Sequence, residues 1–135
     1  MKKLSVLLLA LFGFISFSAQ ADVATAEQAA KQYSLFAKSE LSADEGKAFY
    51  TKKLVMIDGK ELACATCHTD NPANVGKHNE TGKPIQPMSP SVNKKRFSNL
   101  NDSAKGFTKH CKQIYGKDCA AKDKGNFITY LLTFK

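Results

Sequence analysis

The chain has 135 residues, 43% of them hydrophobic and 24% charged, and its 20 Lys and Arg against 12 Asp and Glu give a net charge of +8 at pH 7. This length makes it one domain with a modest core, which a cofactor or a disulfide would help to stabilise. The basic balance suits an acidic partner or an anionic surface, although scattered lysines are also common on any solvated face. The motifs of a nucleic-acid-binding protein are absent.

The N-terminus has the three parts of a secretory signal peptide. Two lysines precede an apolar run over residues 4–17, and small residues follow as far as Ala21. The run is shorter than the ~20 residues of a transmembrane helix, so a cleaved leader is favoured over an uncleaved anchor. We therefore expect a signal peptide at residues 1–21 and a mature, periplasmic domain at residues 22–135, with 18 basic and 12 acidic residues and a net charge of +6. The mature domain contains no apolar run that would span a membrane.

Two helices are predicted at the start of the mature domain. Thr25 and Gln28 are typical of a helix N-terminus, and apolar residues follow at i, i+4 and i+7, namely Ala29, Tyr33 and Phe36. This pattern predicts a helix from Thr25 to about Ser39 with the apolar stripe buried. The capping pattern recurs over residues 42–45 and predicts a second, short helix.

Turn signals dominate the middle of the domain. Asp58-Gly59 lies between the apolar residues 54–57 and residues 60–62, which predicts a small β-hairpin. All four prolines lie between Thr69 and Leu100. Because an irregular loop of ~30 residues is uncommon in a compact domain, we expect this segment to wrap a cofactor.

Two more helices are predicted near the C-terminus. Residues 101–103 are typical of a cap, and the next helix carries an apolar stripe and ends near Gly116; the stripe consists of Phe107, Cys111 and Ile114. His110 lies about 60° from the centre of this stripe, so we expect it beside the buried face and not in solvent. A wide apolar stripe predicts the last helix over residues 121–134. The predicted fold class is mostly α.

The segment CATCH at residues 64–68 is the C-x-x-C-H attachment signature of a c-type haem. Cysteines three residues apart stand on one side of a helical turn, so Cys64 and Cys67 can both reach the vinyl groups of one porphyrin edge. A thioredoxin-type redox pair would need a βαβ unit, and a zinc site that also used His110 would need a second closely spaced ligand pair. We therefore predict one covalent haem, with thioethers at Cys64 and Cys67 and His68 as the proximal iron ligand.

Three residues are candidates for the second axial ligand of the iron. His78 lies in a polar loop and is expected to face water. Met88 lies between two prolines, only twenty residues from His68, which is short for a chain that passes round the haem edge. His110 lies beside an apolar helix stripe and is favoured, although a histidine at the edge of the core would explain the same pattern.

Cys111 and Cys119 remain after haem attachment and pair most simply with each other in an oxidising compartment. Their position next to His110 would limit the movement of that histidine. A plain staple that is indifferent to the iron is the alternative.

Four segments make the sequence similar to the family of cytochrome c-double-prime and, less closely, sphaeroides haem protein. They are CATCHTDNPANVGK, TGKPIQPMSPSVNKKRF, FTKHCKQIYGKDC and NFITYLL. The resemblance implies a class I cytochrome c-like fold around one covalent haem, with an extra N-terminal helix. It places the proximal ligand at His68, the distal ligand at His110 and a disulfide between Cys111 and Cys119.

The departures from the family pattern are informative. The oxygen-binding branch has asparagine at the position of His110, so this chain resembles the bis-histidine branch. Met88 replaces a leucine, which implies that it packs near the haem without binding the iron. Gly125 replaces a better helix former, which we expect to weaken the last helix slightly.

The resemblance implies electron transfer and not enzymatic catalysis. It also implies that His110 detaches on reduction, which would couple reduction to proton uptake. Other cytochromes, including a dihaem one with an acidic face, are the implied partners. The alternative is an oxygen- or nitric-oxide-binding haem protein or a haem enzyme at the open ferrous iron, which would also bind carbon monoxide.

Overall fold

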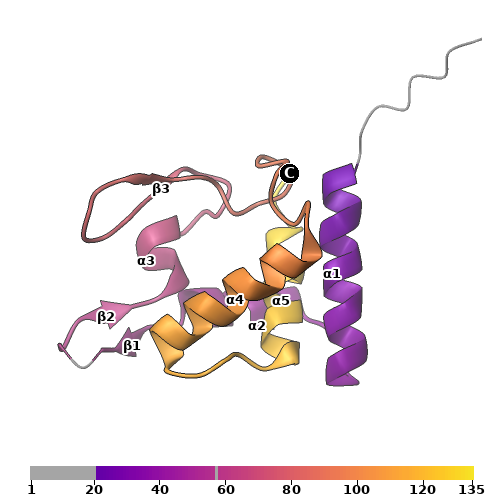
Figure 1. Cartoon of the computed structure of the whole chain (residues 1–135), viewed down its shortest axis with the longest axis horizontal. Helices are drawn as coiled ribbons and strands as arrows, with labels where there is room; N and C mark the ends of the chain where they lie inside the picture. Colours follow the sequence, from indigo (N-terminus) through magenta and orange to yellow (C-terminus); the bar gives the residue numbers. More distant parts are fainter. Residues whose placement is uncertain (1–20, 57) are drawn as a thin grey trace, which may run out of the picture.

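The computed structural model describes residues 21–56 and 58–135. This part of the chain forms five helices and two small antiparallel sheets, labelled in Figure 1. The bounds are α1 Ala21–Ala37, α2 Ala43–Thr51, β1 Leu54–Val55, β2 Glu61–Leu62, α3 Cys64–His68, β3 Gly76–Lys77, β4 Pro84–Ile85, α4 Leu100–Tyr115 and α5 Ala121–Leu131. The mostly α fold class is confirmed.

The predicted signal peptide at residues 1–21 lies outside the described residues, apart from Ala21. In the described ranges, every helix is too short or too polar to cross a membrane.

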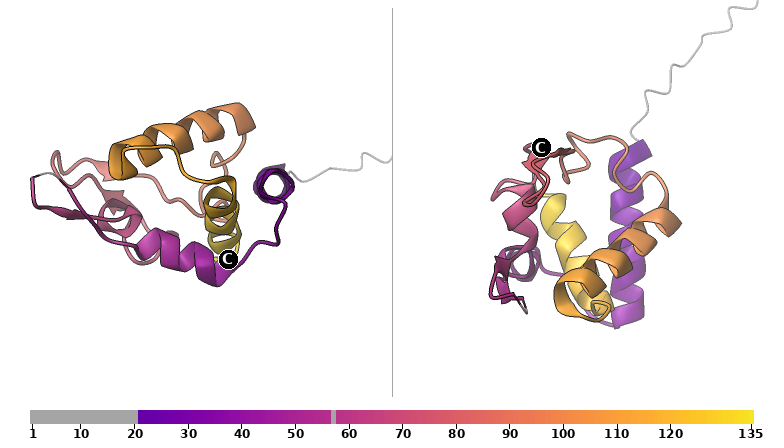
Figure 2. Two further views of the ribbon diagram at one scale, coloured as in Figure 1. Left: turned by 90° about the horizontal axis from the view of Figure 1, so that it is seen from below. Right: turned by 60° about the vertical axis from the view of Figure 1, so that its left-hand side comes forward.

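Helix α5 is central to the fold and packs against both α1 and α2 (Figures 1 and 2). Its side chains Phe127, Ile128 and Leu131 have exposed fractions of 2%, 0% and 0%. Tyr50 of α2 and Ala26 of α1 are fully buried at the two contacts. Because burying one large apolar side chain contributes roughly 1.5–3 kcal/mol, α5 supplies much of the hydrophobic stabilisation.

The predicted start of α2 is confirmed and is joined to α5. Ser42 is the N-cap, and its hydroxyl accepts a hydrogen bond from the amide of Glu45 at 3.2 Å. The buried Asn126 of α5 accepts from the Ser42 amide at 2.8 Å and donates to the Glu45 carboxylate at 2.6 Å. These bonds set the position of α2 relative to α5.

Two glycines allow the close approach of the helices. A Cβ atom on Gly46 of α2 would clash with the carbonyl group of Asn126 in α5. A Cβ atom on Gly125 would lie 2.6 Å from Cδ2 of Leu41 and 3.1 Å from Cβ of Tyr33. Gly125, which by helix propensity looked like a weak point, therefore leaves room for these neighbours.

We expect Gly46→Ala to lower the free energy of unfolding by about 1–3 kcal/mol, because the two helix backbones must separate to admit the methyl group. Urea denaturation of both proteins measures the difference. Gly106→Ala is the matched control: Gly106 is also helical, but a Cβ there meets no atom within 4 Å. That variant should be neutral or more stable, by up to about 1 kcal/mol. Equal losses in both variants would contradict the packing argument.

The structure corrects the prediction for the first helix. Helix α1 begins at Ala21 and not at Thr25, because residues 22–24 include neither proline nor glycine and continue the helix. Phe36 is 75% exposed, so it does not belong to the buried stripe. The buried face consists of the small residues Ala26, Ala29 and Ala30. Small side chains let α1 approach α5 closely.

The middle of the chain contains more regular structure than predicted. The hairpin around Asp58-Gly59 is confirmed, with β1 paired antiparallel to β2. A second hairpin, β3 with β4, lies inside the predicted loop at residues 69–100. Each of these strands has two residues, too few for a periodic pattern in the sequence.

The two C-terminal helices occur close to where they were predicted. Helix α4 is capped by Asn99, two residues earlier than expected, because its side chain accepts from the amides of Asn101 and Asp102. It ends at Gly116 with a left-handed φ of 72°, as predicted. Helix α5 ends at Leu131, three residues before the predicted end.

Candidate haem site

The C-x-x-C-H segment forms α3, a helix of five residues. At its start the Ala63 amide donates to the Thr66 hydroxyl at 2.9 Å, and at its end Thr69 has a φ of 65°. The Thr69 carbonyl accepts from the Tyr50 hydroxyl at 2.6 Å. Helix α2 therefore fixes the end of α3 immediately after His68.

Strand β3 packs directly on α3. Gly76 is buried, and a Cβ atom there would clash with the carbonyl oxygen of Cys67 and lie 3.0 Å from the Cα of His68. Any side chain at this position would push the C-x-x-C-H segment away. Gly76 is therefore a structural requirement of the site that the motif itself did not reveal.

The four cysteines are in two different states. Cys111 of α4 and Cys119, just before α5, form a disulfide with a Cα–Cα distance of 5.6 Å. Cys64 and Cys67 are free and half-buried. Burial raises the pKa of the Cys64 thiol to about 11. One pair of thiols thus remains available beside His68.

His68 has the properties of a residue that needs a further ligand. Its Nδ1 is buried and has no hydrogen-bond partner in the described part of the chain. Burial, followed by the charges of Arg96 and His110, lowers the pKa of His68 to about 4. The imidazole is therefore neutral near pH 7, which is the form that binds metals. Burying an unpaired polar atom costs about 1–3 kcal/mol, which a hydrogen-bond or ligand partner for Nδ1 would offset.

His110 is exposed, so the prediction that it avoids solvent is wrong for the polypeptide as described. The reason is that long aromatic side chains make much of the contact between α4 and the core. Phe107 packs on Phe127 with ring centroids 5.3 Å apart, and Tyr115 stacks on Phe49 at 5.4 Å. The helix face beside buried Cys111 is therefore not covered by protein, which would leave room for a flat cofactor.

The surroundings of His110 also favour its neutral form. Neighbouring protein atoms displace water from part of the ring and lower the pKa of His110, and the charges of Lys109 and Arg96 act in the same direction. A hydrogen bond with Gln113 opposes them. The influence of Arg96 on both histidines shows that α3, α4 and the turn before α4 converge here.

The other two candidate ligands have different roles. His78 is half-buried, and its Nδ1 accepts from the amides of Glu80 and Thr81 at 3.3 Å each, so it stabilises the turn between β3 and β4. Met88 is partly buried against the hydrophobic core. Among the described residues, no three His, Cys, Asp or Glu side chains form a cluster that could hold a zinc ion.

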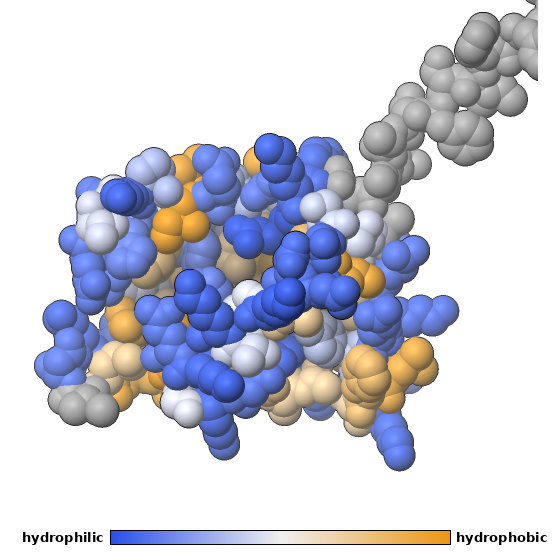
Figure 3. Space-filling model, in the orientation of Figure 1, coloured by the Kyte–Doolittle hydropathy of each residue, from blue (hydrophilic) through white to orange (hydrophobic). Residues whose placement is uncertain are grey.

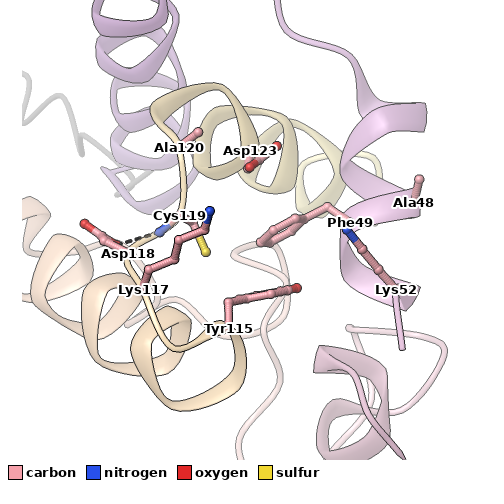
Figure 4. Close-up of a pocket in the computed structure, with 9 residues that line it drawn as sticks. All are labelled: Ala48, Phe49, Lys52, Tyr115, Lys117, Asp118, Cys119, Ala120 and Asp123. Carbon is pink, nitrogen blue, oxygen red and sulfur yellow. Dashed lines mark hydrogen bonds between the residues drawn. The ribbon is translucent and has the colours of Figure 1, made fainter. Parts of the chain in front are cut away.

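A cavity of about 570 Å³ lies between α2 and the segment that joins α4 to α5 (Figure 4). Phe49, Tyr115 and the disulfide-bonded Cys119 are among its lining residues. Neither His68 nor His110 is among the residues that line this cavity. Burial, then the nearby Cys64, raises the pKa of Tyr115 to about 12, so Tyr115 lies between this cavity and the haem-binding segment. Sequence patterns did not single out Tyr115, since an aromatic residue at a helix end has no local signature.

A polar cluster next to the disulfide holds α4 in place. The carboxylate of Asp118 accepts from the Lys124 ammonium at 2.8 Å and from the Thr108 hydroxyl at 3.0 Å. The Lys124 side chain is only 9% exposed and lies 5.9 Å from the centre of the Tyr33 ring. The hydrogen bond from Lys124 is the main cause that lowers the pKa of Asp118. The cluster links α4, two residues before His110, to α5.

We expect the double substitution of Cys111 and Cys119 by serine to lower the free energy of unfolding by about 2–3 kcal/mol, because the unfolded chain loses a short closed loop. Denaturation in urea measures this loss. Dithiothreitol should lower the stability of the unmodified protein and leave the double variant unchanged. An unchanged stability after substitution would mean that the bridge does not stabilise the fold.

Comparison with known proteins places this site in a family. Residues 36–131 match the family model described as a domain of unknown function, DUF1924. The chain is 47% identical over 133 residues to cytochrome c'' of Methylophilus methylotrophus, which covers 93% of this chain and 92% of that protein. It is 26% identical over 99 residues to the cytochrome c-type protein SHP of Cereibacter sphaeroides, covering 73% and 76%.

Solved structures agree with these similarities. The crystal structure of oxidised cytochrome c'' from Methylophilus methylotrophus matches with a TM-score of 0.80 over 83% of this chain and 96% of that one. The structure of oxidised SHP, an oxygen-binding cytochrome c, matches with a TM-score of 0.71 at 25% identity, over 78% and 94%. The fold expected from the sequence is thus confirmed, and the chain belongs to the cytochrome c'' family.

Proposed function

We propose that this chain is a periplasmic cytochrome that transfers electrons through one covalently bound haem c. The main support is the state of the cysteines: Cys111 and Cys119 are joined, whereas Cys64 and Cys67 stay free beside the half-buried His68. Membership of a family of cytochromes supports the same function. The predicted signal peptide at residues 1–21 supports export.

The residues of the site would have distinct roles. A bound haem supplies an iron that gains and loses one electron. Cys64 and Cys67 would hold its edge through thioether bonds, and His68 and His110 would ligate the iron in the oxidised state. Tyr115, which lies near Cys64, would help to keep water from that edge.

We also propose that His110 leaves the iron on reduction, as the family resemblance implies. Two features support this movement: the His110 side chain is exposed, and α4 contacts the core through aromatic side chains and one disulfide. The released imidazole would take up a proton on its free nitrogen at pH values below its pKa. The disulfide and the Asp118 cluster would keep the helix near enough for His110 to return.

The charge on α4 fits a redox partner with an acidic face, such as a dihaem cytochrome. Lys105, Lys109 and Lys112 recur at i, i+4 and i+7 and are exposed, so they share one face of the helix that carries His110. Such a row of positive charges would steer an acidic protein to this side of the molecule.

A second candidate function is binding of oxygen, nitric oxide or carbon monoxide at the iron after His110 leaves. The similarity to SHP, whose solved structure is described as an oxygen-binding cytochrome c, favours it. The relatives are named as cytochromes, and we assign no catalytic residue.

Production in a host that assembles c-type cytochromes tests the proposal. The haem should stay attached to the unmodified chain in denaturant, and replacement of both Cys64 and Cys67 by serine should abolish this attachment. Absorption spectra of the oxidised and reduced protein then report the ligands. A colourless mature protein, or an oxidised spectrum with a sulfur-ligand band, would overturn the assignment.

A further inference from the structure

Arg96 is a half-buried cation that forms no ion pair among the described residues. Its Nε is buried and has no hydrogen-bond partner among the described residues. One terminal nitrogen donates to the carbonyl of Pro87 at 3.4 Å, which is a long bond to a neutral group. Arginine stays charged at pH 7 even when burial lowers its pKa, as it does here. Because leaving a buried donor of a charged group unpaired is costly, a carboxylate or another anion is expected at Nε.

The guanidinium lies near both haem-ligand candidates. The charge of Arg96 is among the causes that lower the pKa of His68 on α3 and of His110 on α4. These two histidines come from elements separated by more than thirty residues. Arg96 therefore lies where the two sides of the proposed haem site meet.

The backbone around Arg96 is held in place. The Arg96 amide donates to the carbonyl of Asn93 at 2.9 Å, and the Asn93 side chain donates to the carbonyl of Pro87 at 2.9 Å. Phe97 has a left-handed φ of 64° while its side chain is only 4% exposed in the core. A bulky residue rarely adopts this conformation, and here the burial of the ring maintains it. The turn thus fixes where the guanidinium points.

The choice of arginine at position 96 stands out in this sequence. Arg96 is the only arginine among the 20 basic residues, and lysine serves everywhere else. The planar guanidinium differs from the lysine ammonium in that Nε and a terminal nitrogen can bind both oxygens of one carboxylate. Haem carries two such carboxylates, its propionates. We propose that Arg96 binds a haem propionate through its free Nε–H and a terminal N–H, and thereby orients the haem between His68 and His110; this assignment rests on the proposed function.

The test compares three variants of the haem-loaded protein. Arg96→Gln removes the charge and the fork, Arg96→Lys keeps the charge only, and Lys94→Gln removes the same charge from an exposed residue two positions away. Haem made from aminolevulinate with isotopic carbon at its carboxyl group carries the label only in the propionates. Infrared difference spectra between the redox states then report these carboxylates directly.

We expect the labelled carboxylate band to shift in Arg96→Gln, to shift less in Arg96→Lys and to stay in place in Lys94→Gln. The midpoint potential should fall most in Arg96→Gln, because the unpaired propionate charge stabilises oxidised iron. If Arg96→Gln does not fold, comparing Arg96→Lys with Lys94→Gln tests the proposal. Of these two variants, only Arg96→Lys changes the proposed contact with the propionate.

An unshifted band in folded Arg96 variants would overturn the assignment and leave Arg96 with only its bond to Pro87. Failure of the proposed function would give a different result. The unmodified chain would then carry no haem and yield no labelled band, and both the function and the assignment of Arg96 would be overturned.

Discussion

Replacing His110 with alanine is expected to convert the oxidised protein from a six-coordinate, low-spin form to a high-spin form. The haem should remain attached, because Cys64, Cys67 and His68 lie in α3. Local hydrogen bonds that do not involve His110 hold this helix. The fold should also persist, because His110 is exposed and contributes little to packing. Absorption and electron paramagnetic resonance spectra of the oxidised variant measure the change.

Two control variants exclude the other candidate ligands. His78→Ala should retain the low-spin spectrum, since its Nδ1 accepts hydrogen bonds from its own turn. Met88→Leu should retain it as well, because Met88 packs against the core. A low-spin spectrum that persists in His110→Ala and disappears in either control would assign the distal position to that other residue.

The midpoint potential of the unmodified protein is expected to rise as the pH falls below about 6.5, with a slope that approaches ~59 mV per pH unit for one proton per electron. If His110 leaves the iron on reduction, the reduced state binds one more proton than the oxidised state, so acid favours reduction. Burial lowers the pKa of His110, which moves the onset of the slope below the ordinary histidine value. Redox titration across the acidic range measures it.

His110→Ala is the control for this second prediction, because it removes the group that would take up the proton. Its potential should lose the slope. A potential of the unmodified protein that does not change between about pH 5 and pH 7 would show that histidine release and proton uptake are not coupled. Low-spin spectra in both redox states would then indicate an electron carrier without a ligand switch.

The C-x-x-C-H segment could be recognised in the sequence because the motif depends on local spacing. Cys64, Cys67 and His68 lie within one helical turn, so five consecutive residues are enough to identify them. The helix caps at Ser42 and Gly116 and the turn at Asp58-Gly59 are local for the same reason, and the structure has all three.

The solvent exposure of side chains was harder to predict, because it depends on which helices pack against each other. Phe36 continues an apolar stripe in the sequence but is 75% exposed, since α5 contacts the small residues of α1. The neighbouring Leu35 is 68% exposed. Figure 3 shows a hydrophobic area over the C-terminal end of α1. His110 was misjudged in the same way, because periodicity does not show how far α4 stands from the core.

Short-range patterns thus identified the attachment motif, the helices and the candidate iron ligands of this cytochrome, since each is encoded within a few residues. Contacts between distant segments explain Gly46 and Gly76 and support the role proposed for Arg96. Each of these three depends on a neighbour far along the chain or on a second element: the carbonyl of Asn126, the backbone of α3, and the two histidines on α3 and α4. A glycine or an arginine has no local signature of such a role, because the role exists only after the chain has folded.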